Sequence, residues 1–312
     1  MRIGKLWKAF FVENIYCVGY RYAGDSFAYE EKNAEFVMQT LDWKKWCADP
    51  IICDAGDKTY VFVEEMNRMT NRAHISVMTL DRSDGMSLPK VAIKEPFHMS
   101  FPETFVKGQK RYMIPETSEV GEMRIYRCDG KTDKWKMVCS FPETCIDIAI
   151  MEQGGDVYCI ASQEHPKNRH KTKLKIYMLD VMGESLKECN QMETDCEYSY
   201  SARNGGKIII RNGEYYRVAQ RSTKEFYGKC VDIFRINRFE ETKVYQEHKI
   251  AELSVEDLKL KYKNRFYKPI GMHTYGHVNG WEVIDVNTEH FSVLVPFQKM
   301  MRVMNRKRMQ RK

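Results

Sequence analysis

Five segments of this chain repeat one short pattern, and the repeat limits the possible folds more than any other feature. Each segment begins with a large aromatic residue, continues through mostly apolar residues and reaches a polar residue four positions later. The aromatic residues follow one another at intervals of 52, 46, 58 and 65 residues, and they are Tyr60, Tyr112, Tyr158, Tyr216 and Trp281. Because side chains alternate along a strand, the aromatic and the polar residue share a face.

The residues around each segment indicate a β-hairpin. Gly56, Gly108 and Gly154 lie four residues before the first three aromatic residues, and Gly213 and Gly280 lie closer in the last two copies. Partner strands are expected at 74–80, 123–128, 173–179, 230–236 and 290–296. Every copy therefore contains a strand, a glycine turn and further strands.

The interval between copies matches one four-stranded blade of a β-propeller. We therefore predict an all-β, five-bladed β-propeller formed by residues 1–298 as a single domain. The strand-rich segment 6–22 is expected to pair with the last blade and close the ring. Two β-sandwiches are the alternative, although sandwiches do not usually repeat an anchor residue so regularly.

Few segments of the sequence favour a helix or a long loop over a strand. Residues 255–263 are expected to form a short helix or a charged loop, and residues 167–173 a basic, polar loop. Residues 299–312 form a short basic C-terminal tail, expected to be helical with its methionines on one side.

Charge and cysteine spacing limit the partners. The tail carries seven cations and no acid, so the other 298 residues are formally neutral although the net charge is +7. This argues against nucleic acid as a partner. Ten cysteines without a CxxC pair favour thiols in a reducing compartment and argue against a zinc site. With no segment typical of a signal peptide or a membrane-spanning helix, we expect a cytoplasmic protein.

Acids recur in register on the strands expected to line the propeller axis. Eleven residues before the aromatic residue, the first three copies place Asp49, Phe101 and Asp147. An acid at the head of an apolar strand is unusual for a solvated face, so Asp49 and Asp147 are predicted to be catalytic. The alternative is an aspartate that caps turn amides.

The last residue of each segment forms a second polar ring. Glu116 is predicted to be catalytic, because Pro115 removes a ladder donor and ends or bulges the strand where the glutamate emerges. Glu64, Gln220 and Asp285 are predicted to contact the substrate. The alternative is a set of exposed hairpin ends that carry acids for solubility.

Six further residues beside the blades are predicted to contact the substrate: His98, Ser100, Arg203, Arg217, Tyr227 and His273. A guanidinium fork grips a phosphate or a carboxylate, so Arg203 and Arg217 are expected to hold a leaving phosphate. Structural hydrogen bonds of the histidines and ion pairs of the arginines are the alternatives. The chain contains no GxGxxG, Walker, HExxH or GxSxG motif.

The ordered series of these strings resembles the glucosamine inositolphosphorylceramide transferase N-terminal domain family over residues 43–285. The strings are Trp46-Cys-Ala-Asp-Pro50, Tyr60-Val-Phe-Val-Glu-Glu65, His98-Met-Ser-Phe-Pro102, Tyr112-Met-Ile-Pro-Glu116, Arg124-Ile-Tyr-Arg127, Trp135, Ser201-Ala-Arg203, Tyr216-Arg-Val-Ala-Gln220, Tyr227-Gly228 and His273-Thr274. In plants this domain precedes a glycosyltransferase domain, whereas bacterial relatives stand alone among surface-polysaccharide genes. No transferase domain follows in this sequence, so we expect that activity not to carry over whole.

A more distant likeness is to the five-bladed propellers of the glycoside hydrolase family 43 superfamily. It implies a general base in blade one, a pKa-tuning aspartate in blade two and a glutamate acid in blade three. Asp49 matches the base, but Phe101 and Asp147 stand at the other two positions. This departure argues against simple hydrolysis.

Together these features predict a carbohydrate-active propeller, with glycosyl transfer in bacterial-type surface-polysaccharide or glycolipid assembly as the leading function. Asp49 is assigned as base, and Glu116 or Asp147 as acid or electrostatic stabiliser. The expected ligand is a carbohydrate or a nucleotide sugar. A non-catalytic glycan-binding propeller and a protein-interaction scaffold are the alternatives.

No cofactor is expected, although Asp49, Asp147 and His273 also fit a divalent cation on the axis. The tail from Lys299 to Lys312 is expected to contact an anionic membrane peripherally, at the inner membrane face. A solvated end is the alternative for the tail.

Overall fold

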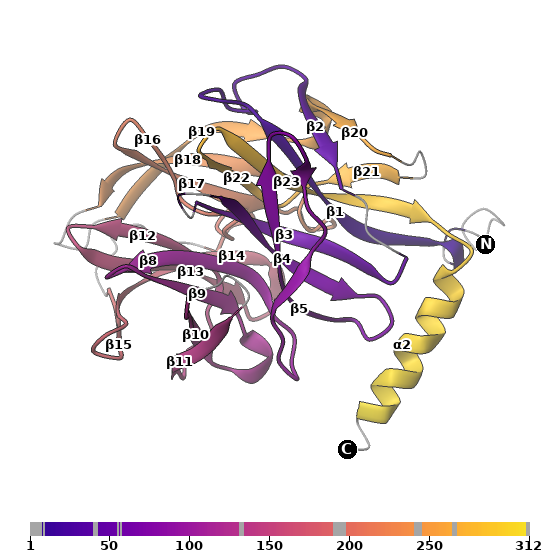
Figure 1. Cartoon of the computed structure of the whole chain (residues 1–312), viewed down its shortest axis with the longest axis horizontal. Coiled ribbons are helices and arrows are strands. Elements are labelled where there is room, and N and C mark those ends of the chain that lie inside the picture. Colours follow the sequence, from indigo (N-terminus) through magenta and orange to yellow (C-terminus); the bar gives the residue numbers. More distant parts are fainter. Residues whose placement is uncertain are drawn as a thin grey trace.

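In the computed structural model the chain forms five β-sheets, which are arranged as blades around one axis (Figure 1). It describes residues 8, 10–39, 43–54, 56, 58–130, 134–189, 198–239, 245–263 and 267–309. The prediction of an all-β, five-bladed β-propeller is confirmed.

The first four blades are built from consecutive antiparallel strands. Blade 1 contains β3 (Lys45–Asp54), β4 (Thr59–Asn67), β5 (Arg72–Asp81) and β6 (Gly85–Met86), with β7 (Lys90–Ile93) also paired to β5. Blade 2 contains β8 (Ser100–Lys107), β9 (Lys110–Glu116), β10 (Met123–Cys128) and β11 (Trp135–Phe141), with the 3-10 helix η1 (Ser118–Val120) after β9. Blade 3 contains β12 (Ile146–Gln153), β13 (Asp156–His165), β14 (Asn168–Asp180) and β15 (Ser185–Glu188). Blade 4 contains β16 (Ile209–Arg211), β17 (Glu214–Arg221), β18 (Cys230–Phe239) and β19 (Tyr245–Leu253).

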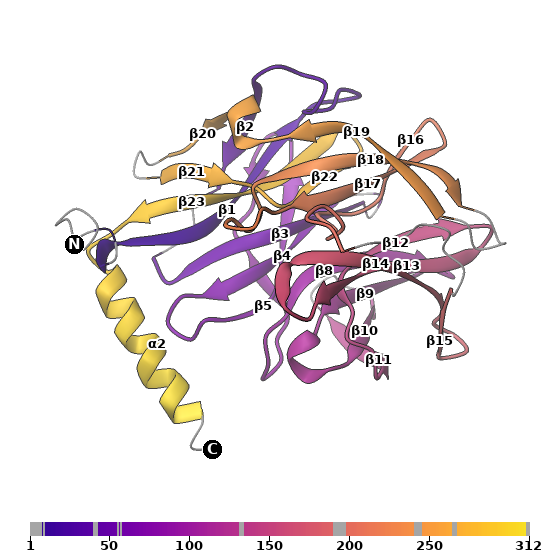
Figure 2. The same cartoon turned by 180° about the vertical axis from the view of Figure 1, so that it is seen from behind.

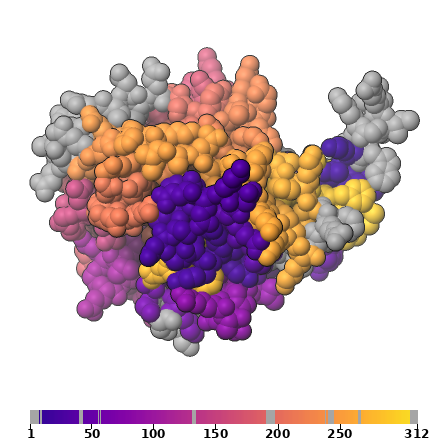
Figure 3. Space-filling model, turned by 90° about the horizontal axis from the view of Figure 1, so that it is seen from above, coloured from indigo at the N-terminus to yellow at the C-terminus, as the bar shows by residue number. Residues whose placement is uncertain are grey.

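Blade 5 joins the two ends of the chain. Its strands are β21 (Tyr267–Gly271), β22 (Tyr275–Val278), β23 (Trp281–Phe291), β1 (Val12–Tyr22), β2 (Ala34–Met38) and β20 (Leu258–Lys261). β1 pairs with β23 over eleven residues, from Val12 opposite Phe291 to Tyr22 opposite Trp281. Figure 3 shows the indigo N-terminal residues enclosed by orange and yellow residues from the other end of the sequence. This pairing closes the ring.

Apolar contacts between neighbouring blades hold the ring together. The five aromatic residues of the repeat lie in the second strand of their blades, which are β4, β9, β13, β17 and β23. Between blades 5 and 1, Val18 and Val283 pack with Ile52, Val61 and Val63, and all five are buried. Each such side chain contributes about 1.5–3 kcal/mol when fully buried, so the inter-blade layers supply most of the stabilising free energy.

Two predictions of local structure need correction. Residues 167–173 do not form a loop, because β14 begins at Asn168 and pairs with β13. Thr172 and Leu174 are buried on one face of that strand, and this alternation places a basic segment in a sheet. Residues 255–263 begin with a short 3-10 helix, η2 (Val255–Asp257), but continue as strand β20, which pairs in parallel with β2.

The C-terminal residues form a helix that stands beside the propeller. This helix, α2 (Val295–Met309), begins four residues earlier than the predicted tail. Figures 1 and 2 show it projecting from the edge of the molecule near the N-terminus, outside the five sheets but alongside them.

Candidate functional site

The first strands of blades 1, 2 and 3 bulge at the same place. Asp49, Phe101 and Asp147 have φ angles of 48°, 42° and 43°, and the pairing with the next strand shifts register at each of them. A left-handed backbone costs a non-glycine residue about 1–3 kcal/mol, so the surrounding structure must hold it. The bulge lets Asp49 and Asp147 reach partners from other blades.

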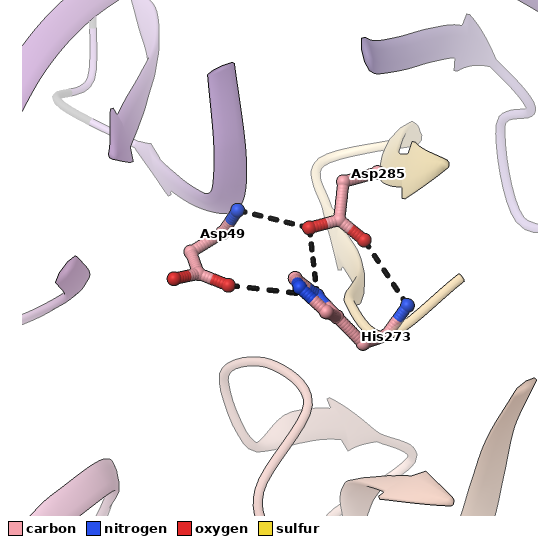
Figure 4. A group of neighbouring side chains, drawn as sticks. All are labelled: Asp49, His273 and Asp285. Carbon is pink, nitrogen blue, oxygen red and sulfur yellow. Dashed lines mark hydrogen bonds and ion pairs between the residues drawn. The ribbon is translucent and has the colours of Figure 1, made fainter. Parts of the chain in front are cut away.

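Asp49 meets His273 and Asp285 of blade 5 near the axis (Figure 4). Asp285 is fully buried, and its carboxylate accepts hydrogen bonds from the backbone N–H groups of Asp49, His273 and Thr274 at 3.0, 3.1 and 2.9 Å. The imidazole Nδ1 of His273 lies 2.8 Å from Asp285 Oδ2 and 3.6 Å from Asp49 Oδ1. Asp285 therefore fastens blade 1 to blade 5.

The carboxylates of Asp49 and Asp285 favour the protonated form of His273. Burial alone would lower the pKa of His273, but the charges of Asp285 and Asp49 outweigh it and raise the pKa above 6.5. Burial raises the pKa of Asp49, and His273 opposes that rise. The side chain of Asp49 is 13% exposed and that of Asp285 is 0% exposed, so Asp49 is the carboxylate that a ligand can reach.

Glu64 of β4 lies next to Asp49. Burial, the charge of Asp49 and a hydrogen bond with it raise the pKa of Glu64 well above its ordinary value. His98 Nε2 lies 3.7 Å from Glu64 Oε1, and His98 Nδ1 accepts a hydrogen bond from the Ala73 N–H at 3.2 Å. Glu64 therefore keeps its proton and can donate it to Asp49.

Arg203 forms the centre of a second group. Its guanidinium contacts Asp147 and lies 3.6 Å from Glu116 Oε2 and 3.2 Å from Glu164 Oε1. The guanidinium carbon lies 5.3 Å from the centre of the Tyr227 ring, and that ring lies 5.8 Å from the His273 ring. Tyr227 thus connects the Arg203 group with the Asp49 group.

Glu116 and Asp147 differ in protonation although they are neighbours. Burial alone would raise the pKa of Glu116, but Arg203 and a hydrogen bond from Asp147 lower it. Burial raises the pKa of Asp147 well above its ordinary value despite Arg203, and the charge of Glu116 raises it further. The site therefore holds a carboxylic acid at Asp147 beside a carboxylate at Glu116, which suits acid–base chemistry.

The loop before β16 fixes Arg203. The N–H of Gln220 donates to the Arg203 carbonyl at 2.8 Å, and the Asn204 amide donates to the Asp147 and Ile160 carbonyls at 2.6 and 2.7 Å. The Gln220 side chain donates to Ser222 Oγ at 3.1 Å. The backbone of Gln220 therefore positions Arg203, whereas the side chain of Gln220 bonds another residue of blade 4.

Two residues that were predicted to contact the substrate do not lie at the centre of the cluster. The Arg217 guanidinium is 1% exposed and bonds Glu247 at 2.7 and 2.5 Å and Asn204 Oδ1 at 3.2 Å. Arg217 thus forms an ion pair with an acid of its own blade, whereas the alternative expected an acid of a neighbouring blade. Ser100 pairs with Glu116 across β8 and β9 and is buried at the border of the cluster.

Two residues that the sequence did not suggest join the cluster. Glu164 contacts Arg203 and lies two residues after Ser162, so the period-two alternation along β13 was the available signal. The Tyr16 ring lies 4.4 Å from the His273 ring and 5.4 Å from the Trp46 ring. Tyr16 belongs to the closing strand β1, outside the repeat, and no pattern points to it.

A cavity of about 240 Å³ lies on the other side of Tyr16. Its lining is aromatic and basic, and it consists of Ile15, Tyr16, Cys17, Trp43, Lys45, Trp46, Arg68, Tyr267, His290 and Ser292. Arg68 is buried, and its Nε has no hydrogen-bond partner among the described residues, nor does His290 Nδ1. Both nitrogens are enclosed by protein, and the cations Arg68 and Lys45 pair with Glu13 and Glu65.

Two groups of side chains in the described structure have the composition of a metal site. Ligand atoms of Asp49, His273 and Asp285 lie within 4.8 Å of one another, as do those of Cys230, Asp232 and Glu252. In the second group Lys249 and Arg221 already pair with the two acids. In the first, Asp285 is bound to three backbone N–H groups, so a cation would have to displace the imidazolium of His273.

Proteins with similar sequences include two from plants. The chain is 28% identical over 193 residues to "Glucosamine inositolphosphorylceramide transferase 1" of Arabidopsis thaliana, covering 61% of this chain and 25% of that protein. It is 27% identical over 218 residues to the protein of the same name from Oryza sativa subsp. indica, covering 68% and 29%. The chain therefore spans less than a third of the length of these relatives.

Solved structures with similar folds include carbohydrate-active enzymes. A family 117 glycoside hydrolase of Zobellia galactanivorans aligns with a TM-score of 0.51 and 8% identity, covering 90% of this chain and 91% of that one. The β-1,2-mannobiose phosphorylase of Listeria innocua aligns with a TM-score of 0.51 and 10% identity, covering 83% and 94%. At this identity the likeness concerns the fold alone.

The model of one sequence family matches residues 36–273, a span that contains Asp49, His273, the Arg203 group and most of the propeller, but not Asp285. The chain belongs to the family described as glucosamine inositolphosphorylceramide transferase 1, N-terminal.

Proposed function

We propose that the axial cluster binds a sugar and acts in glycosyl transfer. The observation that carries this proposal is the cluster of carboxyl groups around Arg203 and His273, in which Asp147 and Glu116 face Arg203 and Asp49 faces His273. Transfer at an anomeric carbon needs a base near the acceptor hydroxyl and an acid or a cation near the leaving group. The family and the names of the plant relatives support the same chemistry.

The roles follow from exposure and protonation. Asp49 is the more accessible carboxylate of its group, and His273 opposes the rise of its pKa, so we assign it as base. Asp147 retains a proton and is assigned as acid, with Glu116 as the charge that stabilises a developing oxocarbenium ion. Of the two acids that the sequence left open, the raised pKa of Asp147 supports Asp147 as the acid.

Charge indicates where a phosphate would bind. Arg203 and His273 face five carboxyl groups, and Arg203 already contacts three of them, so the axial cluster favours a neutral sugar ring over a phosphate. The cavity beyond Tyr16 is lined by Lys45 and Arg68, which pair with Glu65 and Glu13, so cations and acids are balanced there. We assign the phosphate of a nucleotide sugar, or of a glycolipid acceptor, to this cavity.

The test is ligand binding followed by turnover. Saturation-transfer NMR of the purified chain against nucleotide sugars, free nucleotides and neutral oligosaccharides is expected to give signals from the sugar ring of a nucleotide sugar. Asp49→Asn keeps the shape of the side chain and removes the base, so sugar binding should survive while turnover falls at least about a hundredfold. An Asp49→Asn variant with full turnover would refute the assignment.

A second candidate function is glycan binding without catalysis. Phe101 favours this function, because it occupies the bulge of blade 2. The equivalent bulges of blades 1 and 3 carry acids, so Phe101 leaves the ring of three acids incomplete. In that case neutral oligosaccharides bind saturably, Asp49→Asn binds equally well, and no product forms with any donor. The binding and turnover experiment therefore separates the two functions.

A further inference from the structure

Helix α2 attaches to the propeller through polar side chains. Gln298 donates to the Trp43 carbonyl at 2.6 Å, Arg302 to the Arg68 carbonyl at 2.7 Å and Asn305 to the Met69 carbonyl at 3.0 Å. Arg302 also forms an ion pair with Glu13 of β1. These three side chains recur at helical spacing, so one polar stripe of α2 is fixed against the ends of the strands.

The exposed side of α2 is apolar. Phe297, Met300, Val303 and Met304 are 44, 52, 56 and 56% exposed. Val293 and Leu294, just before the helix, are 71 and 37% exposed, and Phe291 and Phe10 beside them are 39 and 55% exposed. A helix on the surface of a soluble protein normally has the reverse orientation, with its apolar stripe against the core.

The sequence at this end of the chain is basic. After Glu289 the sequence contains no acid, and from Lys299 to Lys312 it carries seven cations. A second copy of the chain would bring the same cations together and repel, whereas an anionic surface would attract them. The described helix is not of the kind that crosses a bilayer, being too short and too polar for that.

We propose that α2 and the apolar residues beside it dock in the interface of an anionic lipid membrane. The apolar side chains enter the boundary between headgroups and acyl chains, and the cations remain among the anionic headgroups. The helix lies in the membrane plane and stays attached to the propeller through Gln298, Arg302 and Asn305.

The attachment places the membrane near the axial cluster. β23 carries Asp285 and ends six residues later at Phe291, and β4 carries Glu64 four residues before Arg68, whose carbonyl binds α2. At about 3.3 Å per residue these distances are roughly 20 and 13 Å. Trp43 and Arg68, whose carbonyls bind α2, also line the cavity, so a phosphate on a lipid headgroup beside α2 would lie close to it.

Co-sedimentation of the full chain with vesicles tests the proposal. The chain is expected to bind vesicles made of equal parts phosphatidylcholine and phosphatidylserine, and to bind pure phosphatidylcholine vesicles much more weakly. Changing Phe297, Met300, Val303 and Met304 to Ser is expected to weaken binding at least about tenfold. Neutralising Arg306, Lys307 and Arg308 to Gln should weaken it on the order of a hundredfold, at about 1 kcal/mol per cation.

A matched control changes exposed apolar residues elsewhere. Leu88, Met137 and Ile210 are 72, 51 and 64% exposed, and their replacement by Ser should leave vesicle binding unchanged. Unaltered binding in both α2 variants, or equal binding to the two kinds of vesicle, would overturn the proposal. So would light scattering that finds a dimer of the wild-type chain and a monomer of the four-Ser variant, because α2 would then be a self-interface. Sugar binding measured by NMR on the same variants remains an independent readout of the axial site.

Discussion

The Arg217–Glu247 ion pair in blade 4 allows a quantitative test of whether Arg217 is structural. Arg217 is 1% exposed, and Glu247 accepts both of its short hydrogen bonds and a further one from Tyr245. Glu247→Gln keeps the shape of the side chain but leaves a buried guanidinium without its counter-ion. Losing one partner of a buried pair costs about 3–5 kcal/mol. Because the Gln oxygen still accepts one hydrogen bond, we expect a loss of about 3 kcal/mol.

Urea unfolding followed by circular dichroism measures this loss. A decrease of about 3 kcal/mol in the free energy of unfolding is a large fraction of the 5–15 kcal/mol typical of a folded protein, so the midpoint should fall clearly. Glu188→Gln is the control, because Glu188 is 44% exposed and its pair with Lys175 should contribute about 0–1 kcal/mol. If Glu247→Gln loses less than about 1 kcal/mol and instead changes sugar binding, Arg217 serves the ligand and our interpretation of it is wrong.

Two further predictions concern the axial cluster. His273 has its pKa raised above 6.5 in the folded state, so it contributes stability that is complete below 6.5 and is lost as the pH rises through the folded pKa. The deficit of His273→Asn in urea unfolding should therefore shrink as the pH rises over that range. A deficit independent of pH would contradict this charge state. A Cβ on Gly205 would lie 2.5 Å from the His273 carbonyl oxygen. Gly205→Ala should therefore lower the thermal midpoint by several degrees and weaken sugar binding through Arg203, and a variant with native stability would show that the loop can shift.

The blades could be predicted from the sequence because each one repeats the same alternation. Counting back from an aromatic residue located Asp49 and Asp147 correctly in first strands, since those strands are regular in length. The bulges could not be predicted, because neither Phe101 nor the residues beside it favour a positive φ. Nothing pointed to Tyr16, whose approach to His273 depends on pairing between the two ends of the chain.

Blade 4 shows why two arginines were hard to distinguish. Its first strand is only three residues long, and Arg203 lies before it in a loop, where no strand register applies. Arg217 does lie in a strand, and it is three residues from Gln220, an odd separation that puts the two side chains on opposite faces. That parity was the signal that the side chains of Arg217 and Gln220 have different surroundings. The cytoplasmic location stays a prediction.

The pairing of β1 with β23 has a consequence for how the ring assembles. Blades 1 to 4 are made of neighbouring segments and can begin to form as soon as each is synthesised. The partner of β1 lies more than 250 residues later in the sequence. One edge of β1 therefore stays unpaired until the ribosome has synthesised β23 as far as Phe291. Such distant pairing slows folding, and it leaves the first strand exposed to wrong partners during that delay. We expect the nascent chain to depend on chaperones most during this interval, and the completed ring to unfold as one cooperative unit.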